Sequence, residues 1–309
     1  MFTIIDNERK ESLMEANSYV NNHQEIQKRN SQFKLQCIRF SRNKLAMTGF
    51  VVILVLVIAV LTAPLYISYD KVVAQKLTDR FQTPSFQHIL GTDQFGRELF
   101  ARIIYGGQIS LFAGIVATVM SFVVGAILGG LSGYFGGKAD MLIMRFCDIL
   151  MAVPGMLLSM AIVAALGQGL FKMLIALAVS SMPFTARSTR AVVMTLRGQE
   201  YIEAAKTYGS STRRILTRHI LPNILGPSII SITMSVGSVI LRIASLGFLG
   251  IGIASPTPEW GTIISENQVN LRYYPYLGII PGLFIMVSVM CLNFIGDGLR
   301  DALDPKMKK

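Results

Sequence analysis

The side chains of this sequence that could perform covalent chemistry or bind a metal ion do not have the spacing that such sites require. The histidines and cysteines number three each, lie far apart and include no CxxC pair: His23, His88, His219, Cys37, Cys147 and Cys291. Such spacing does not fit a metal-ligand set. The nearest string to a phosphate-binding GxxxxGK[ST] loop ends at Gly137-Lys138, but Ser132 stands at its first glycine. With no GxSxG motif either, the sequence predicts no catalytic residue, no metal site and no cofactor in this chain.

The polar segment with the most specific spacing is 199–222, QEYIEAAKTYGSSTRRILTRHILP. The residues before Gly209 favour a helix, and glycine readily adopts the left-handed conformation that ends one. The Ser-Ser-Thr run that follows can cap a second helix, and Pro222 suits the first turn of the next. We therefore predict a helix-turn-helix on the inner face of a membrane. Its small alanines leave room for another protein to approach closely.

The composition requires that these polar segments be positioned by membrane helices. Hydrophobic residues make up 52% of the 309 residues and charged residues only 15%, with a mean hydropathy of +0.51. A soluble domain carries about 25% charged residues, so this chain has too few charged side chains for a surface that is exposed to water on all sides. A cytosolic enzyme and a secreted disulfide-bonded domain are therefore excluded, and an all-α polytopic membrane protein is predicted.

Six apolar segments are candidates for transmembrane helices. They cover residues 45–67, 109–134, 149–166, 173–186, 224–253 and 276–295. The first contains no charged residue and exceeds the roughly 20 residues that cross a bilayer. It also lies too far from the N-terminus for a cleaved signal peptide.

The distribution of basic residues predicts that both termini are cytoplasmic. Most of the 29 lysines and arginines fall in the two tails and in the loops near 135–148 and 187–222, and cytoplasmic segments carry this excess. The same spread over separate loops argues against nucleic-acid binding. The predicted organisation is a cytoplasmic tail (1–44), a first span (45–67), an external loop (68–104), a five-helix core (105–300) with a cytoplasmic coupling loop (187–222), and a C-terminal tail (301–309). Within the tail, residues 33–44 form either an interfacial helix or a short basic stop before the first span.

Segment 199–222 resembles the EAA loop of ABC importer permeases, which docks into a groove of the ATPase subunit. The matching residues are Glu203, Ala204, Ala205, Gly209, Leu221 and Pro222. The resemblance assigns ATPase coupling to these six, and Arg213 and Arg214 are further candidates for ATPase contacts. His219 replaces the isoleucine of the general pattern, in a form typical of the peptide branch.

Other blocks resemble the dipeptide/oligopeptide/nickel permeases, and among them the second, C-type, of two paralogous subunits. They include HILGTDQFGRELFARIIYGGQISL from His88, MRFCDILMAVPGMLL from Met144, SLGFLGIG from Ser245, PTPEWG from Pro256 and GDGLRDALDPKMKK from Gly296. The sequence departs from the pattern at Glu98 and Ala101, where Asp and Ser are expected. It also has Arg242-Ile243 where the family usually places an acidic residue, which weakens any transfer of substrate preference.

The resemblance implies a type I ABC importer permease in a bacterial plasma membrane, forming half of a translocation pore. Its expected partners are the lipid bilayer, a homologous second permease, an extracytoplasmic substrate-binding protein and two ABC ATPase subunits, which bind ATP and Mg. Di- or oligopeptides are the expected cargo, with nickel or a metal chelate as the alternative. A rival of another class is an ATP-independent secondary transporter, which predicts inverted repeats and a central charge set. Neither feature is evident in the sequence.

Four glycines recur every four residues along the end of the second predicted span: Gly125, Gly129, Gly133 and Gly137. Successive members turn only about 40° around a helix of 3.6 residues per turn, so they form one slowly winding groove. Small residues at this spacing let membrane helices approach closely. We predict that this groove packs against another helix of the chain or of the partner permease.

Charged residues in or near the predicted spans are candidates for a binding role or for structural ion pairs. Arg242 lies in the fifth predicted span, where an intramembrane charge indicates function by default. It either faces the translocation path and attracts a carboxylate, or reaches the interface or an acid of the partner. Three local ion pairs are also predicted from helical spacing: Arg145 with Asp148, Asp93 with Arg97, and Glu98 with Arg102.

Overall fold

The computed structural model describes residues 34–303, and these residues are predominantly helical. Among these described residues, five helical segments are long and apolar enough to span a membrane. They are α2 (Lys44–Tyr66), α4 (Leu99–Phe135), α7 (Leu170–Arg197), α12 (Tyr276–Leu303) and the continuous run Thr212–Phe248, most of which is α10 (Leu221–Phe248). A sixth span results if α5 (Gly137–Met151) and α6 (Gly155–Leu166), bent by 87° at their junction, are counted as one. The predicted all-α architecture is confirmed, with six spans on that count.

The third predicted span, 149–166, is wrong as a continuous helix. α5 ends at Met151, and α6 begins only at Gly155. Pro154 lies in this break, and a proline disfavours helical backbone in the residue before it. The 12 residues of α6 extend about 18 Å, well short of the ~30 Å hydrocarbon core. The chain therefore does not cross a bilayer through this segment as one straight helix.

Two other helices are longer than their apolar runs indicated. α4 begins at Leu99, inside the predicted external loop 68–104, and α7 continues to Arg197, inside the predicted coupling loop 187–222. Two arginines of the α7 extension form ion pairs with aspartates of α5: Arg187 with Asp148 at 2.5 Å, and Arg190 with Asp140 at 2.5 Å. These pairs explain how a charged stretch remains helical against a neighbouring helix.

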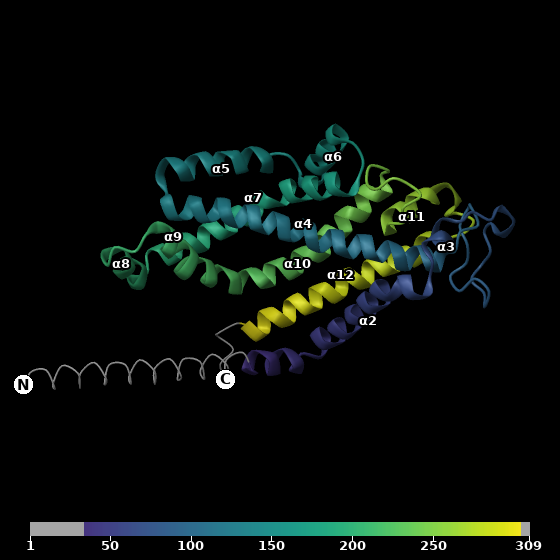
Figure 1. Ribbon diagram of the computed structural model, residues 1–309, viewed down its shortest axis with the longest axis horizontal. Coiled ribbons are helices and arrows are strands. Elements are labelled where there is room, and N and C mark those ends of the chain that lie inside the picture. Colours follow the sequence, from purple (N-terminus) through teal and green to yellow (C-terminus); the bar gives the residue numbers. More distant parts are fainter. Residues whose placement is uncertain (1–33, 304–309) are drawn as a thin grey trace, which may run out of the picture.

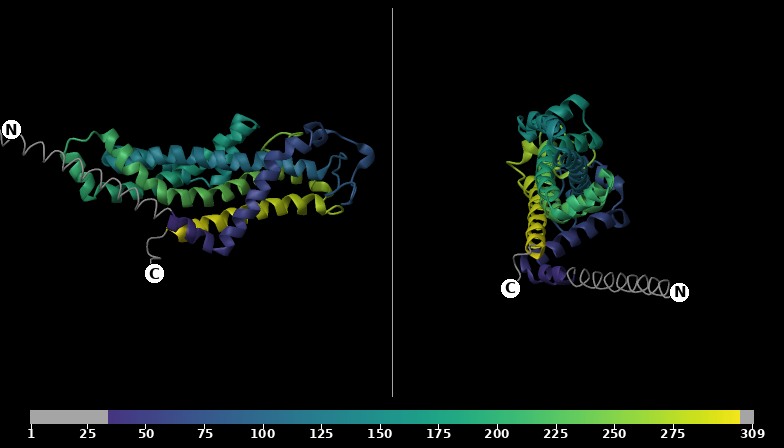
Figure 2. Two further views of the ribbon diagram at one scale, coloured as in Figure 1. Left: turned by 60° about the horizontal axis from the view of Figure 1, so that its bottom comes forward. Right: turned by 90° about the vertical axis from the view of Figure 1, so that its left-hand side faces the viewer.

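The long helices pack in an elongated bundle (Figure 1). α4 runs along α7 with the most extensive helix–helix contact in the described chain, and α10 packs against both α4 and α12. α2 packs against α12 (Figure 2), and in Figure 1 it lies on the side of α12 away from α5 and α6. Many apolar side chains of α2 are exposed, among them Val55 and Leu61, as expected for a helix that faces lipid.

The short elements gather at the two ends of the bundle (Figure 1). One end carries α8 (Glu200–Thr207), α9 (Thr212–Arg214) and the π-helix η2 (Ile215–Ile220). The other carries α3 (Tyr69–Val73) and α11 (Trp260–Glu266), with the 3-10 turns η1 (Leu77–Asp79) and η3 (Gln268–Asn270). The sequence places the α8 end in the cytoplasm, and that orientation stays a prediction.

Glu259 fixes α11 against the N-terminal half of α4. Its fully buried carboxylate accepts hydrogen bonds from the backbone N–H groups of Gly261 (3.0 Å) and Thr262 (2.9 Å) and from the Ser110 hydroxyl (3.0 Å). Burial raises the pKa of the Glu259 carboxyl above its ordinary value, although these hydrogen bonds oppose the rise. The indole N–H of buried Trp260 donates to the Ile103 carbonyl at 2.9 Å. α11 is thus joined to α4 by polar contacts at two adjacent residues.

The described part of the N-terminal tail is also helical. Residues 34–42 form a helix that ends before Asn43, whose side chain caps α2 by accepting from the Ala46 N–H at 3.1 Å. Leu35 and Ile38 are exposed on it. Residue 33 of the predicted interfacial segment and the rest of the tail, 1–32, lie outside the described residues. Contact of this helix with a membrane surface stays a prediction.

Candidate functional site

The turn between α8 and α9 has the geometry expected from its residues. Gly209 adopts a φ of +75°. The N–H of Gly209 donates to the Lys206 carbonyl at 2.9 Å, and the N–H of Ser210 donates to the Ala205 carbonyl at 3.0 Å. This pair of bonds is a Schellman motif, which satisfies carbonyls at the end of α8. Ser211 then caps the next helix by accepting from the Arg214 N–H, so the predicted helix-turn-helix is confirmed.

One face of this helix-turn-helix is anchored to the bundle. Ile202 of α8 is fully buried and packs with Val193 of α7 and with Ile215, Ile220 and Ile224 of the following helices. Ala205 is partly buried against the same cluster. This buried cluster joins α8 to α7 and α10 through side-chain packing.

Seven of the eight residues assigned to ATPase coupling are exposed: Glu203, Ala204, Gly209, Arg213, Arg214, Leu221 and Pro222. Leu221 and Pro222 belong to the first turn of α10, not to the loop. Because a proline has no N–H, Pro222 cannot donate to a carbonyl in the π-helical turn before it. The exposed residues thus combine an acidic side chain, two arginines and the small side chain of Ala204 at one end of the bundle.

A cavity of about 340 Å³ opens between α4, α7 and α10. Most of its lining side chains carry hydroxyl groups: Thr118 and Ser121 from α4, Ser180, Ser181, Thr185, Ser188 and Thr189 from α7, and Ser228, Ser231, Ser235 and Ser238 from α10. The single charged side chain in the lining is Arg242, whose Nη2 donates to the Ser181 Oγ at 2.7 Å. The structure therefore places Arg242 in a polar cavity between three helices, and its role in a translocation path stays a prediction.

Comparison with known protein families identifies the chain. Residues 121–309, more than half of the sequence, match the model described as a binding-protein-dependent transport system inner membrane component. The chain belongs to this family. Residues 31–84 also match the N-terminal transmembrane domain of oligopeptide transport permease C. The resemblance to the C-type subunit and the multi-pass location in a bacterial plasma membrane are both confirmed by these matches and by the bacterial relatives below.

Three bacterial relatives are similar over most of their length. The dipeptide transport system permease protein DppC of Alkalihalophilus pseudofirmus is 44% identical, covering 87% of this chain and 88% of the relative. The oligopeptide permease OppC of Bacillus subtilis is 39% identical (90% and 91% covered). The glutathione permease GsiD of Escherichia coli is 42% identical (87% and 89% covered).

A solved structure confirms the permease fold. An inward-facing form of the MetNI methionine ABC transporter superposes with a TM-score of 0.55 at 19% identity, covering 67% of this chain and 98% of that one. The type I ABC importer permease fold expected from the sequence is therefore present. At this identity the likeness concerns the fold alone.

Three of the four spaced glycines of this permease lie where α4 meets α7. A Cβ on Gly125 would lie 2.8 Å from the Met182 carbonyl oxygen, and one on Gly133 would lie 2.9 Å from that of Arg190. Gly129 approaches the Ala186 carbonyl even more closely. Gly137 differs, because it is the first residue of α5 and nothing lies within 4 Å of its Cβ position. The groove formed by the first three thus contacts a helix of the same chain.

Of the three predicted local ion pairs, two are wrong. Asp148 pairs with Arg187 of α7 and not with Arg145. Glu98 contacts His88 at 2.6 Å, because Glu98 is the N-cap of α4 with an extended ψ of 114° and the Arg102 guanidinium pairs with Asp93 and Glu266 instead.

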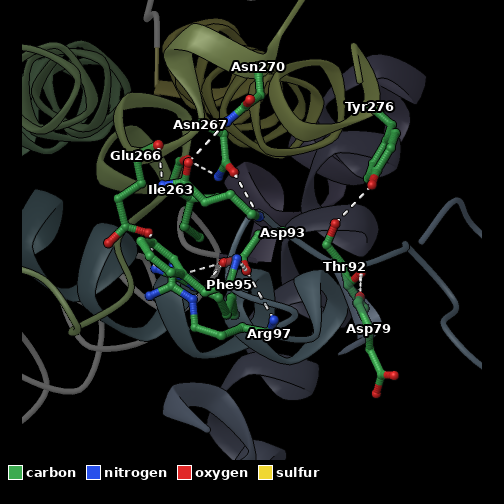
Figure 3. Close-up of polar contacts among 12 residues, drawn as sticks. Asp79, Thr92, Asp93, Phe95, Arg97, Ile263, Glu266, Asn267, Asn270 and Tyr276 are labelled. Atoms are coloured by element: carbon green, nitrogen blue, oxygen red, sulfur yellow. Dashed lines mark hydrogen bonds and ion pairs between the residues drawn. The ribbon is translucent and has the colours of Figure 1, made fainter. Parts of the chain in front are cut away.

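The third pair, between Asp93 and Arg97, is present at 2.6 Å, although residues 93–97 form a turn and not the expected helix. It belongs to a larger network (Figure 3). Arg102 contacts Asp93 at 2.8 Å, and both arginines contact Glu266 of α11 at 2.6 and 2.8 Å. Both arginines and Asp93 are almost fully buried. This network joins the loop before α4 to α11, and neither its long-range partner nor its burial was expected from the sequence.

The hydroxyl-lined cavity was also missed, although the sequence carries a signal for it. Ser228, Ser231, Ser235, Ser238 and Arg242 follow one another at intervals of three or four residues along α10. This spacing places them on one face of a helix. A polar stripe that ends in an arginine within an apolar span is the pattern expected of a helix that lines a path.

Proposed function

We propose that this chain is one of two permeases that form the translocation pore of an ATP-driven, binding-protein-dependent importer of di- or oligopeptides. The observation that carries the proposal is the helix-turn-helix at the α8 end. Its inner face packs on the spans through Ile202, and its outer face exposes Glu203, Ala204 and two arginines. This arrangement suits a contact that transmits movement from a docked ATPase to the spans.

In the proposed mechanism, two ATPase subunits bind ATP and Mg and dock against the α8–α9 surface. Their closure displaces α8, and the buried contact between Ile202 and Val193 passes that displacement to α7 and α10. Because α7 and α10 line the cavity, it then opens alternately to the two sides of the membrane. A homologous second permease completes the pore, and an external binding protein delivers the cargo.

Two findings support peptide as the cargo. The relatives DppC and OppC are named as dipeptide and oligopeptide permeases. The cavity also offers hydroxyl groups, which can both donate to and accept from the N–H and C=O groups of any peptide backbone. Recognition of this kind is independent of peptide side chains.

Replacing Gly209 by Val is expected to uncouple ATP hydrolysis from transport. There is space for a side chain, since nothing lies within 4 Å of the Cβ position, but the φ of +75° is strongly disfavoured for a β-branched residue. The turn should therefore re-form and displace the exposed face. We expect at least a tenfold loss of uptake per ATP hydrolysed, measured in proteoliposomes.

The matched control is Gly209→Asn, because asparagine tolerates the left-handed conformation. It should retain most of the coupling. Equal coupling in the Val and Asn variants would contradict the role assigned to this turn.

The proposed function is tested by purifying the tagged chain in mild detergent and identifying its companions by mass spectrometry. A second permease and ATPase chains are expected, with uptake of labelled peptide that requires ATP. Recovery of the chain alone or as a homodimer, still transporting in ATP-free vesicles, would replace the proposal with a secondary transporter. ATP-dependent uptake of nickel in place of peptide would retain the importer and change its cargo.

A further inference from the structure

Arg242 is a charged group in the cavity with no charged partner in the described chain. Its side chain is partly buried, and its one hydrogen bond is to the neutral hydroxyl of Ser181. Among the ion pairs of residues 34–303, none includes Arg242. A guanidinium remains protonated in proteins, so the cavity carries a positive charge that no carboxylate of residues 34–303 balances.

A second positive pole lies beside this guanidinium. α6 begins at Gly155, and a Cβ at that residue would lie 4.0 Å from the Nη1 of Arg242. No side chain caps the N–H groups at this end of α6, which carries the positive end of the helix dipole. The break in the bent pair therefore brings a helix N-terminus to the same place as the arginine. Two adjacent positive poles favour an anion between them.

The cavity also holds an unused hydrogen-bonding group. Ser121 is only 3% exposed, lines the cavity, and its Oγ has no hydrogen-bond partner. A buried hydroxyl without a partner costs free energy unless a ligand or water satisfies it. Ser121 thus adds a further hydroxyl to the cavity wall, beside those of α7 and α10.

We propose that Arg242, Ser181 and the N-terminus of α6 form a carboxylate-binding subsite in the translocation path. The inference rests on the proposed peptide-import function and names the group of the cargo that this site recognises. A guanidinium matches a carboxylate geometrically and can bind it through two parallel hydrogen bonds. Every peptide with a free C-terminus carries a terminal carboxylate whatever its sequence. The terminal carboxylate therefore binds at Arg242 while the cavity hydroxyls contact the backbone.

The first experiment measures the charge of the cavity without relying on transport. In a Cys37→Ser background, which removes the exposed thiol and leaves the buried Cys147 and Cys291, Ser238→Cys places a thiol one helical turn from Arg242. Anionic, cationic and neutral methanethiosulfonates are then reacted with the purified complex. Arg242→Met should lower the anionic-to-cationic rate ratio at least about tenfold, and Arg242→Lys should preserve it. An unchanged ratio in Arg242→Met, with an unchanged neutral rate, would overturn the subsite.

The second experiment measures uptake of trialanine and trialanine amide by the intact importer at saturating binding protein. Trialanine has no carboxylate except its C-terminus. We expect Arg242→Met to lower trialanine uptake at least tenfold and amide uptake less than twofold, with partial recovery in Arg242→Lys. Equal losses for both peptides, or no loss, would overturn the inference. If the unaltered importer carried neither peptide, the proposed function would fail instead, and the thiol ratio would still decide whether an anion site exists.

Discussion

Replacement of Asp93 by Asn should destabilise the chain by about 3–5 kcal/mol, the cost typical of removing one partner from a buried ion pair. The Asp93 carboxylate accepts from Arg97 Nε at 2.6 Å and Arg102 Nη1 at 2.8 Å, and both arginines are at most 1% exposed. It also accepts from the backbone N–H groups of Phe95 and Arg97. Without this charge, two buried guanidiniums would share Glu266 alone.

The measurement is the apparent melting temperature of the detergent-purified chain. Unfolding is detected by the reaction of a buried cysteine thiol with a thiol-specific dye as the temperature rises. The matched control is Glu98→Gln, five residues away. Glu98 contacts His88 with 38% of its side chain exposed, and an exposed pair contributes only about 0–1 kcal/mol. A drop in melting temperature no larger for Asp93→Asn than for Glu98→Gln would show that the network does not stabilise this end of the bundle.

Replacement of Gly129 by Leu should prevent α4 and α7 from packing. A Cβ at this position would overlap the Ala186 carbonyl and lie 2.9 Å from the Cβ of Thr189. Backbone atoms cannot move aside as a side chain can, so the two helices would have to separate. We expect a loss above the roughly 1–3 kcal/mol of ordinary overpacking, seen as loss of the monodisperse folded protein in size-exclusion chromatography.

The neighbouring glycine supplies the control. Nothing lies within 4 Å of the Cβ position of Gly130, which lines an open apolar groove between α4 and the η2–α10 segment. Gly130→Leu should therefore leave the chain folded, although both variants add the same side chain to the same helix. If both variants folded equally well, close approach at Gly129 would not be required for the bundle.

Features that depend on neighbours in the chain could be predicted from the sequence. Apolar runs located the long spans, because lipid selects for hydrophobicity and does not require a particular partner. Gly209 and Ser211 predicted the end of one helix and the start of the next, since capping involves residues three or four positions apart. The spaced motifs around Glu203 indicated the family, which the comparisons confirm.

Contacts between distant segments were decided only by the tertiary structure. Helical spacing shows which residues share a face, but not which helix that face meets. A partner four residues away contributes only about 0.5 kcal/mol, so a charge pairs with whatever opposite charge packing brings near and buries with it. Asp148 thus pairs with Arg187 of another helix, and Arg102 with Asp93 and Glu266. The cavity around Arg242 likewise exists only because α4, α7 and α10 turn their hydroxyl-bearing faces toward one another.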